Sequence, residues 1–208
     1  MQEEQSGNTV FLRGEVAAAP SLSHHNHGED YWTFPMAVRR FSGNFDTLNI
    51  IVTAALLEQH PLNRGDTVEV TGEVRSYNNR SGTGSRLVIS VYARSVERGD
   101  GEHENKLMLS GVLCKPAVLR RTPLGRDICD MMLAVNRRYG RSDYLPCIAW
   151  GALARRCAGR SVGDRLTLEG RLQSRSYIKQ LEEGSEERIA FEVSIMQLRE
   201  DEAGESDT

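Results

Sequence analysis

The chain has 208 residues, 39% of them hydrophobic and 26% charged, which is enough apolar material for one large folded domain or two small ones. No apolar run approaches the roughly 20 residues of a membrane-spanning helix, and the acidic, polar start MQEEQSGN does not resemble a signal peptide. We therefore expect a soluble cytoplasmic protein without a membrane partner. The net charge of −3 argues against a nucleic-acid partner only when the chain is taken as a whole.

Alternating apolar and polar residues predict five short strands in the first half, with a Pro-containing loop after the first strand and a short helix after the third. In that loop, SHHNHGED at 23–30 gathers three histidines and two acids. We favour a polar loop over a metal site, because metal ligands normally come from rigid, separated positions. We accordingly expect no metal and no cofactor. The expected strands are Thr9–Ala17, Tyr31–Arg40, Thr47–Thr53, Thr67–Ser76 and Leu87–Val96.

The second half repeats the first with a shift of about 97 residues. NTVFLRGEV at 8–16 matches NKLMLSGVL at 105–113, and DTLNIIVTAAL from Asp46 matches DYLPCIAWGAL from Asp143. Five strands with a helix between the third and fourth are the order of the oligonucleotide-binding (OB) barrel. The expected second set is Lys106–Leu113, Ile128–Arg138, Tyr144–Trp150, Arg165–Ser174 and Ile189–Leu198, with a helix near Ala152–Ala158.

We therefore predict an all-β protein with two tandem five-stranded OB-fold barrels, at residues 1–98 and 105–198. Residues 99–104 are expected to form a linker and residues 199–208 a disordered acidic tail. Gly72 and Gly170 fall in mid-strand, where a barrel has to bend. The four cysteines contain no CxxC pair, and we expect buried free thiols.

Two alternations in the second copy predict a binding face. In residues 165–175, leucines and one glycine alternate with polar residues that include three arginines, so the strand has an apolar side and a basic side. Tyr144, Ile148 and Trp150 also share one side of their strand. Exposed aromatic rings beside guanidinium groups suit single-stranded nucleic acid. Residues 105–198 carry net +6, whereas residues 1–100 carry net −3, so we expect the first copy to bind weakly or to serve in assembly.

The second copy resembles the DNA-binding domain of the bacterial single-stranded DNA-binding proteins. The matching segments, in the family's order, are NKLMLSGVL, RRTPLG, LAVNRRY, DYLPCIAWGALA, VGDRLTLEGRLQSRSY and FEVSIMQL. The resemblance implies an OB barrel that binds single-stranded DNA without regard to base sequence and without performing chemistry. It also implies a role in DNA replication, repair or recombination, and association with the nucleoid.

The resemblance places base-stacking positions at Tyr139, Tyr144 and Trp150. The alternatives are that Trp150 caps the core, that Tyr139 is a loop aromatic without a partner, and that any one arginine is a solvated surface charge. The expected phosphate contacts and neighbouring positions are Arg137, Arg138, Arg171, Arg175, Tyr177, Arg120, Arg121 and Lys106. Possible weaker contacts in the first copy are Trp32, Arg39, Arg40, Phe41 and Tyr77. The loop at 177–188 contains Glu182, Glu183, Glu186 and Glu187, which would repel a phosphate strand.

The family commonly works with four barrels, so we expect a homodimer that supplies four OB folds. The family's acidic tail ends in an apolar tip that docks on repair and replication enzymes, whereas this chain ends in Ser206-Asp207-Thr208, which puts that recruitment in doubt. An alternative is a protein-docking module of a replication or mobile-element complex with little DNA affinity. An enzyme is disfavoured, because the sequence contains no P-loop, nucleophile motif or dinucleotide fingerprint.

Overall fold

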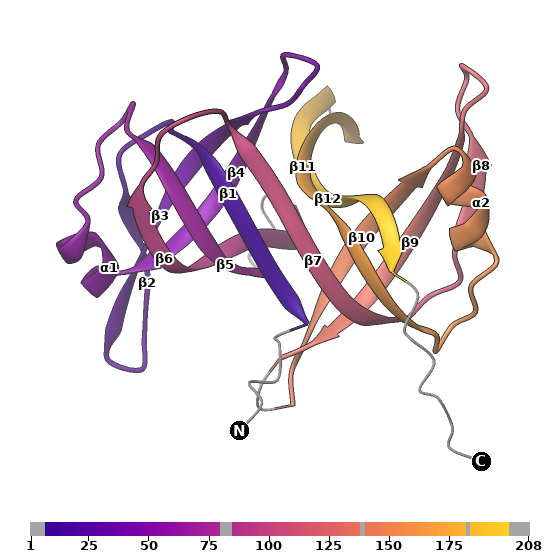
Figure 1. Ribbon diagram of the computed structural model, residues 1–208, viewed down its shortest axis with the longest axis horizontal. Helices are drawn as coiled ribbons and strands as arrows, with labels where there is room; N and C mark the ends of the chain where they lie inside the picture. Colours follow the sequence, from indigo (N-terminus) through magenta and orange to yellow (C-terminus); the bar gives the residue numbers. More distant parts are fainter. Residues whose placement is uncertain (1–6, 80–84, 138–139, 182–183, 200–208) are drawn as a thin grey trace.

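The computed structural model describes residues 7–79, 85–137, 140–181 and 184–199, which contain twelve strands and two short helices (Figure 1). Arg138, Tyr139, Glu182, Glu183 and residues 200–208 lie outside this description. No helix of the described ranges is long and apolar enough to span a membrane. The first half contains β1 (Asn8–Val16), β2 (Ser21–Asn26), β3 (Glu29–Arg39), β4 (Phe45–Thr53), α1 (Ala54–Gln59), β5 (Thr67–Asn78) and β6 (Leu87–Arg98). The second half contains β7 (Glu104–Leu113), β8 (Val118–Arg121), β9 (Asp127–Asn136), β10 (Ser142–Trp150), α2 (Ala152–Ala158), β11 (Arg165–Leu181) and β12 (Gly184–Arg199).

Each half closes into a five-stranded barrel with one helix between its third and fourth strands. In the first barrel β1 pairs with both β3 and β5, and a short parallel pairing of Ile50 with Val91 joins β4 to β6. In the second barrel β7 pairs with both β9 and β11, and Cys147 pairs with Val193 to join β10 to β12. The predicted all-β architecture of two tandem OB folds is confirmed.

The two barrels share one sheet. Strands β1 and β7 lie side by side in the centre of Figure 1 and pair antiparallel, from Asn8 opposite Leu109 to Arg13 opposite Glu104. The twelve strands therefore form a single sheet that curls into a barrel at each end. This pairing satisfies the edge of each barrel, which would otherwise expose unpaired backbone groups.

Two segments expected as loops, β2 and β8, are short strands at the edges of β3 and β9. Every described side chain of both strands is exposed, so neither has a buried face that would produce an alternation in the sequence. The histidine cluster lies on the β2–β3 hairpin, where His25 Nδ1 is 2.8 Å from Asp30 Oδ1. In the described part of the chain, no three or more His, Cys, Asp or Glu side chains are grouped to hold a metal ion.

The two mid-strand glycines lie where the barrels bend, as predicted. The pairing of β5 with β6 shifts register between Thr71 and Gly72, and that of β11 with β12 shifts between Glu169 and Gly170. At each glycine a Cβ atom would overlap a carbonyl oxygen of the neighbouring strand, that of Tyr92 or Ser194. Only glycine allows so close a backbone approach at a bulge.

Alternate residues of the barrel strands contribute to one apolar core cluster that extends through both barrels, as the alternation predicts for most positions. Leu166, Leu168 and Leu172 of β11 are buried. All four cysteines are free thiols, and Cys129, Cys147 and Cys157 are buried. Burial raises the pKa of Cys157 to about 11, so this thiol stays protonated at neutral pH.

Candidate nucleic-acid interface

The outer side of β10 presents two aromatic rings near the ends of the strand. Tyr144 is 50% exposed and Trp150 is 42% exposed, so Trp150 does not cap the core. Ile148 shares this side but is only 5% exposed. It lies in the middle of the sheet, opposite Asp130 of β9 on one side and Ser194 of β12 on the other. The prediction that this side of β10 is exposed is therefore correct for Tyr144 and Trp150 and wrong for Ile148, which is buried.

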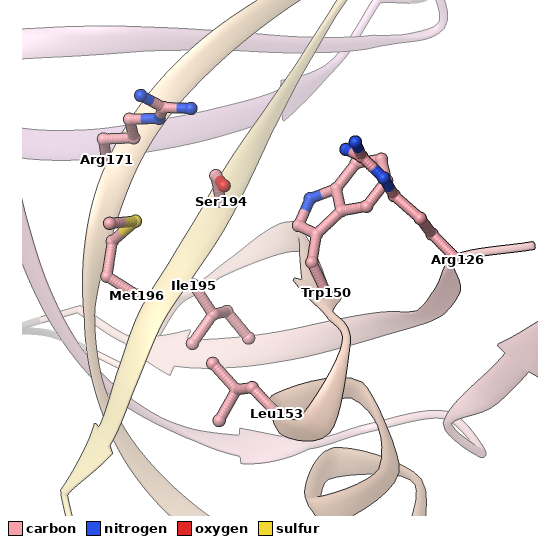
Figure 2. Close-up of a pocket in the computed structure, with 7 residues that line it drawn as sticks. All are labelled: Arg126, Trp150, Leu153, Arg171, Ser194, Ile195 and Met196. Carbon is pink, nitrogen blue, oxygen red and sulfur yellow. The ribbon is translucent and has the colours of Figure 1, made fainter. Parts of the chain in front are cut away.

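Trp150 forms one wall of a surface pocket of about 420 Å³. Figure 2 shows Trp150 and Arg126 on one side of it, Arg171 and Met196 on the opposite side, and Ser194 between them. The aliphatic side chains of Leu153 and Ile195 form its apolar part. The pocket thus combines one indole ring, a hydrophobic surface and two guanidinium groups. This combination can accept a flat base and its phosphate.

Arg126 is a pocket residue that the sequence did not predict. It follows the turn between β8 and β9, in which Gly125 donates a backbone hydrogen bond to the carbonyl of Thr122. This hairpin brings Arg126 beside Trp150, which is 24 residues later in the chain. The RRTPLGR segment contains the arginine, but its approach to Trp150 depends on the pairing of β9 with β10.

Arg171 has a buried Nε with no hydrogen-bond partner among the described residues. On the same outer side of β11, Gln173 Nε2 donates to Glu192 Oε1 at 2.8 Å, and Arg175 Nε lies 3.9 Å from that oxygen. A buried donor without a partner is costly unless a ligand satisfies it. Arg171 also lines the Trp150 pocket, where the rest of its guanidinium can face an anionic oxygen of a bound molecule.

Three further expected phosphate contacts, Arg120, Arg121 and Lys106, are exposed but already face carboxylates. Arg120 pairs with Asp130, and Lys106 pairs with Glu104. Asp127 accepts from Arg155 at 2.5 Å and from Arg121 at 3.1 Å, and these bonds lower its pKa. A phosphate at these positions must compete with a carboxylate that is already bound.

Arg137, an expected phosphate contact, and Arg40, a possible weaker contact of the first copy, both form hydrogen bonds between the two barrels. Arg137 is only 24% exposed; its Nε donates to Asp143 Oδ2 at 2.7 Å and its Nη2 to the Ser76 carbonyl at 2.7 Å. Arg40 makes the corresponding bonds, to Asp46 Oδ2 at 2.8 Å and to the Ser174 carbonyl at 2.8 Å. Sequence periodicity does not reveal partners from the other barrel. We leave both arginines out of the binding surface proposed below.

The first barrel has exposed aromatic side chains but a different charge pattern. Glu69 and Glu73 lie on the outer side of β5, but Glu69 pairs with Arg13, and Glu73 pairs with Arg75 and Arg94. Their negative charges are therefore largely compensated. The expected weaker contacts divide into the exposed Arg39, Phe41 and Tyr77 and the half-buried Trp32, which packs against the core.

A groove of about 850 Å³ lies at the junction of the barrels. It extends from Phe41 and Phe45 of the first barrel to Lys106 and Arg171 of the second. His103 of the connecting segment accepts a hydrogen bond at Nδ1 from the backbone N–H of Arg39 at 2.9 Å. Arg171 lines both this groove and the Trp150 pocket.

The expected loop at 177–188 is mostly a strand hairpin, because β11 continues to Leu181 and β12 begins at Gly184. Tyr177 is half-buried and pairs opposite Arg188. Glu186 forms an ion pair with Arg188 at 2.8 Å. This pairing reduces the repulsion expected from the described acidic residues of the hairpin.

Residues 104–199 match the model of the single-strand binding protein family. Single-stranded DNA-binding protein A of Bacillus subtilis is 34% identical over 83 residues, which cover 36% of this chain and 48% of that protein. The single-stranded DNA-binding protein of Halalkalibacterium halodurans is 30% identical over 99 residues, 44% of this chain and 56% of that protein. The chain thus spans about half the length of these curated relatives.

Among solved structures, the wild-type single-stranded DNA-binding protein of Thermus aquaticus superposes with a TM-score of 0.77. The match has 23% sequence identity and covers 97% of this chain and 96% of that chain. It therefore extends over both barrels and shows that the two proteins share the tandem fold.

Proposed function

Because residues 104–199 belong to the single-strand binding protein family, we propose that this protein binds single-stranded DNA through the outer face of its second barrel, without regard to base sequence. Tyr144 and Trp150 stack on bases, and each stack contributes about 1–3 kcal/mol with any base. Arg126, Arg171 and Arg175 neutralise phosphates. Arg120, Arg121, Lys106 and Tyr177 add weaker contacts. The resemblance also makes Tyr139 a stacking position and Arg138 a phosphate contact, and both lie outside the described residues.

This activity involves no chemical step and requires no cofactor. Its role is to protect exposed single strands during replication, repair or recombination, in association with the nucleoid. The observation that supports it most strongly is the Trp150 pocket, where an exposed indole, an apolar surface and the side chains of Arg126 and Arg171 meet. We further propose that two chains associate as a homodimer with four barrels.

Fluorescence titration tests DNA binding directly. The chain contains two tryptophans, so in Trp32→Phe only Trp150 reports. With oligo-dT we expect strong quenching and an affinity that falls steeply as the salt concentration rises, because bound phosphates release counterions. The matched Trp150→Phe variant, in which Trp32 reports, should show weak quenching. Absence of both quenching and binding at low salt would overturn the proposal.

A further inference from the structure

The β9–β10 hairpin of the second barrel carries proposed binding residues, and side chains and backbone groups of the first barrel contact this hairpin. Ser76 of β5 uses three groups for this contact. Its backbone N–H donates to Asp143 Oδ1 at 2.5 Å, its carbonyl accepts from Arg137 Nη2 at 2.7 Å, and its hydroxyl accepts from the Tyr144 N–H at 2.8 Å. These partners lie at both ends of the β9–β10 turn. One serine of the first barrel therefore holds both strands of the hairpin.

The contact is buried, so its geometry is well defined. Asp143 has no exposed surface and Ser76 is 6% exposed. The Asp143 carboxylate also accepts from Arg75 Nη1 at 3.1 Å and from Arg137 Nε. Buried, fully bonded polar networks of this kind favour one arrangement, because any displacement leaves polar groups unsatisfied.

A similar contact occurs in the reverse direction. Ser174 of the second barrel donates its backbone N–H to Asp46 Oδ1 at 2.7 Å, and its carbonyl accepts from Arg40. The Ser174 hydroxyl makes two longer bonds, because it accepts from the Thr47 N–H at 3.3 Å and donates to Asp46 Oδ1 at 3.2 Å.

The two contacts also differ in the residue that precedes the serine. Arg75 reaches across to Asp143, whereas Gln173 at the matching position bonds to Glu192 of its own barrel. The contact with the shorter bond to a backbone N–H and with the additional arginine thus holds the hairpin with Tyr144.

We propose that Ser76 is a positioning residue for DNA binding: its hydroxyl fixes the backbone of Tyr144 and thereby places the ring on the binding surface of the second barrel. This inference rests on the proposed function. Stacking requires a defined ring position, and a contact residue is most effective when a supporting residue holds it. The acidic first barrel would then contribute to binding by positioning the second barrel's hairpin.

A double-mutant cycle tests this proposal with oligo-dT affinity as the readout. Ser76→Ala should weaken binding about threefold to tenfold, in proportion to the loss of one hydrogen bond. Ser76→Thr keeps the hydroxyl and should restore binding. In a Tyr144→Ala background, Ser76→Ala should cause no further loss, because the positioned ring is absent. The matched control Ser174→Ala removes the equivalent hydroxyl from the other contact and should leave the affinity at the wild-type level.

The outcomes separate this proposal from the proposed function. If the wild-type protein does not bind oligo-dT, the proposed function itself fails. If the wild type binds and Tyr144→Ala weakens binding, wild-type affinity in Ser76→Ala would overturn the positioning role, as would additive losses in the double variant. Should Ser76→Ala not fold by circular dichroism, Ser76→Cys retains a weak acceptor of similar size. An intermediate loss is then expected, and unchanged affinity would contradict the proposal.

Discussion

Individual residues of the second barrel differ in whether their charge is available to a ligand. Arg171 has a buried Nε without a partner in the described chain, whereas Arg120 donates to both oxygens of Asp130. Both lie on exposed sides of strands, so position alone does not separate them. The distinction matters because a phosphate gains less at an arginine that already forms an ion pair, such as Arg120, than at Arg171, which forms none with the described residues.

A substitution at each arginine tests this difference. We expect Arg171→Gln to weaken oligo-dT binding about threefold to tenfold and to reduce the slope of log affinity against log salt by about 0.7, the value for one phosphate contact on a single strand. Arg120→Gln, the matched control, should change the affinity less than twofold, since Asp130 already compensates its charge. Titrations at four salt concentrations measure both quantities. Equal losses in the two variants would contradict the assigned roles.

At the scale of single elements, β11 determines how the binding face is oriented. The bulge at Gly170 lies immediately before Arg171 and bends the strand over the core. The same strand buries Leu168 and Leu172 on its inner side. Its stability and the direction of Arg171 therefore depend on the same backbone geometry.

Gly170→Ala should therefore lower the stability of β11 and change the direction of Arg171. The added Cβ would overlap the backbone carbonyl of Ser194, which cannot rotate away as a side chain could. We expect a loss of about 1–3 kcal/mol in the free energy of unfolding, measured by urea denaturation, together with weaker oligo-dT binding. Gly159→Ala is the matched control, because its Cβ would meet only the Arg156 carbonyl at 3.6 Å, and we expect a change within about 0.5 kcal/mol. A Gly170→Ala variant with wild-type stability would show that the Ser194 carbonyl does leave room for a Cβ atom at residue 170.

At the scale of the whole molecule, the β1–β7 pairing uses the edge of each barrel inside one chain. Two chains must therefore meet through another surface when they form the proposed four-barrel assembly. The connecting segment is also held in place, since Arg13 Nη1 donates to the Glu102 carbonyl at 3.2 Å and to Glu104 Oε2 at 3.3 Å. The two barrels of one chain thus behave as one pre-assembled pair.

We expect light scattering at micromolar concentration to give twice the mass of one chain. This expectation rests on the resemblance, which implies four barrels in the working assembly, whereas one chain supplies two. The measurement should be repeated across a tenfold dilution, because a weak dimer dissociates by mass action. A mass of one chain throughout this range would rule out the homodimer and leave DNA binding by the second barrel to be tested on its own.

The strands, their buried sides and the division into two barrels can be predicted from the sequence alone. The period-two alternation predicted the ten barrel strands and their buried sides, because a strand between core and solvent needs that pattern. The internal repeat predicted two barrels of the same kind, and the spacing in DYLPCIAW predicted two aromatic rings on one side of a strand. The buried thiols followed from apolar neighbours. The two exposed edge strands were missed, since strands without a buried face carry no alternation.

Only the tertiary structure decided which side chains meet. Periodicity says to which side of a strand Arg137 points, but its partner Ser76 is 61 residues earlier and belongs to the other barrel. The burial of Ile148 and the approach of Arg126 to Trp150 likewise depend on how strands pair. A sequence encodes local preference at each residue. Contacts between residues far apart in the chain arise only when the sheet has closed and the two barrels have joined.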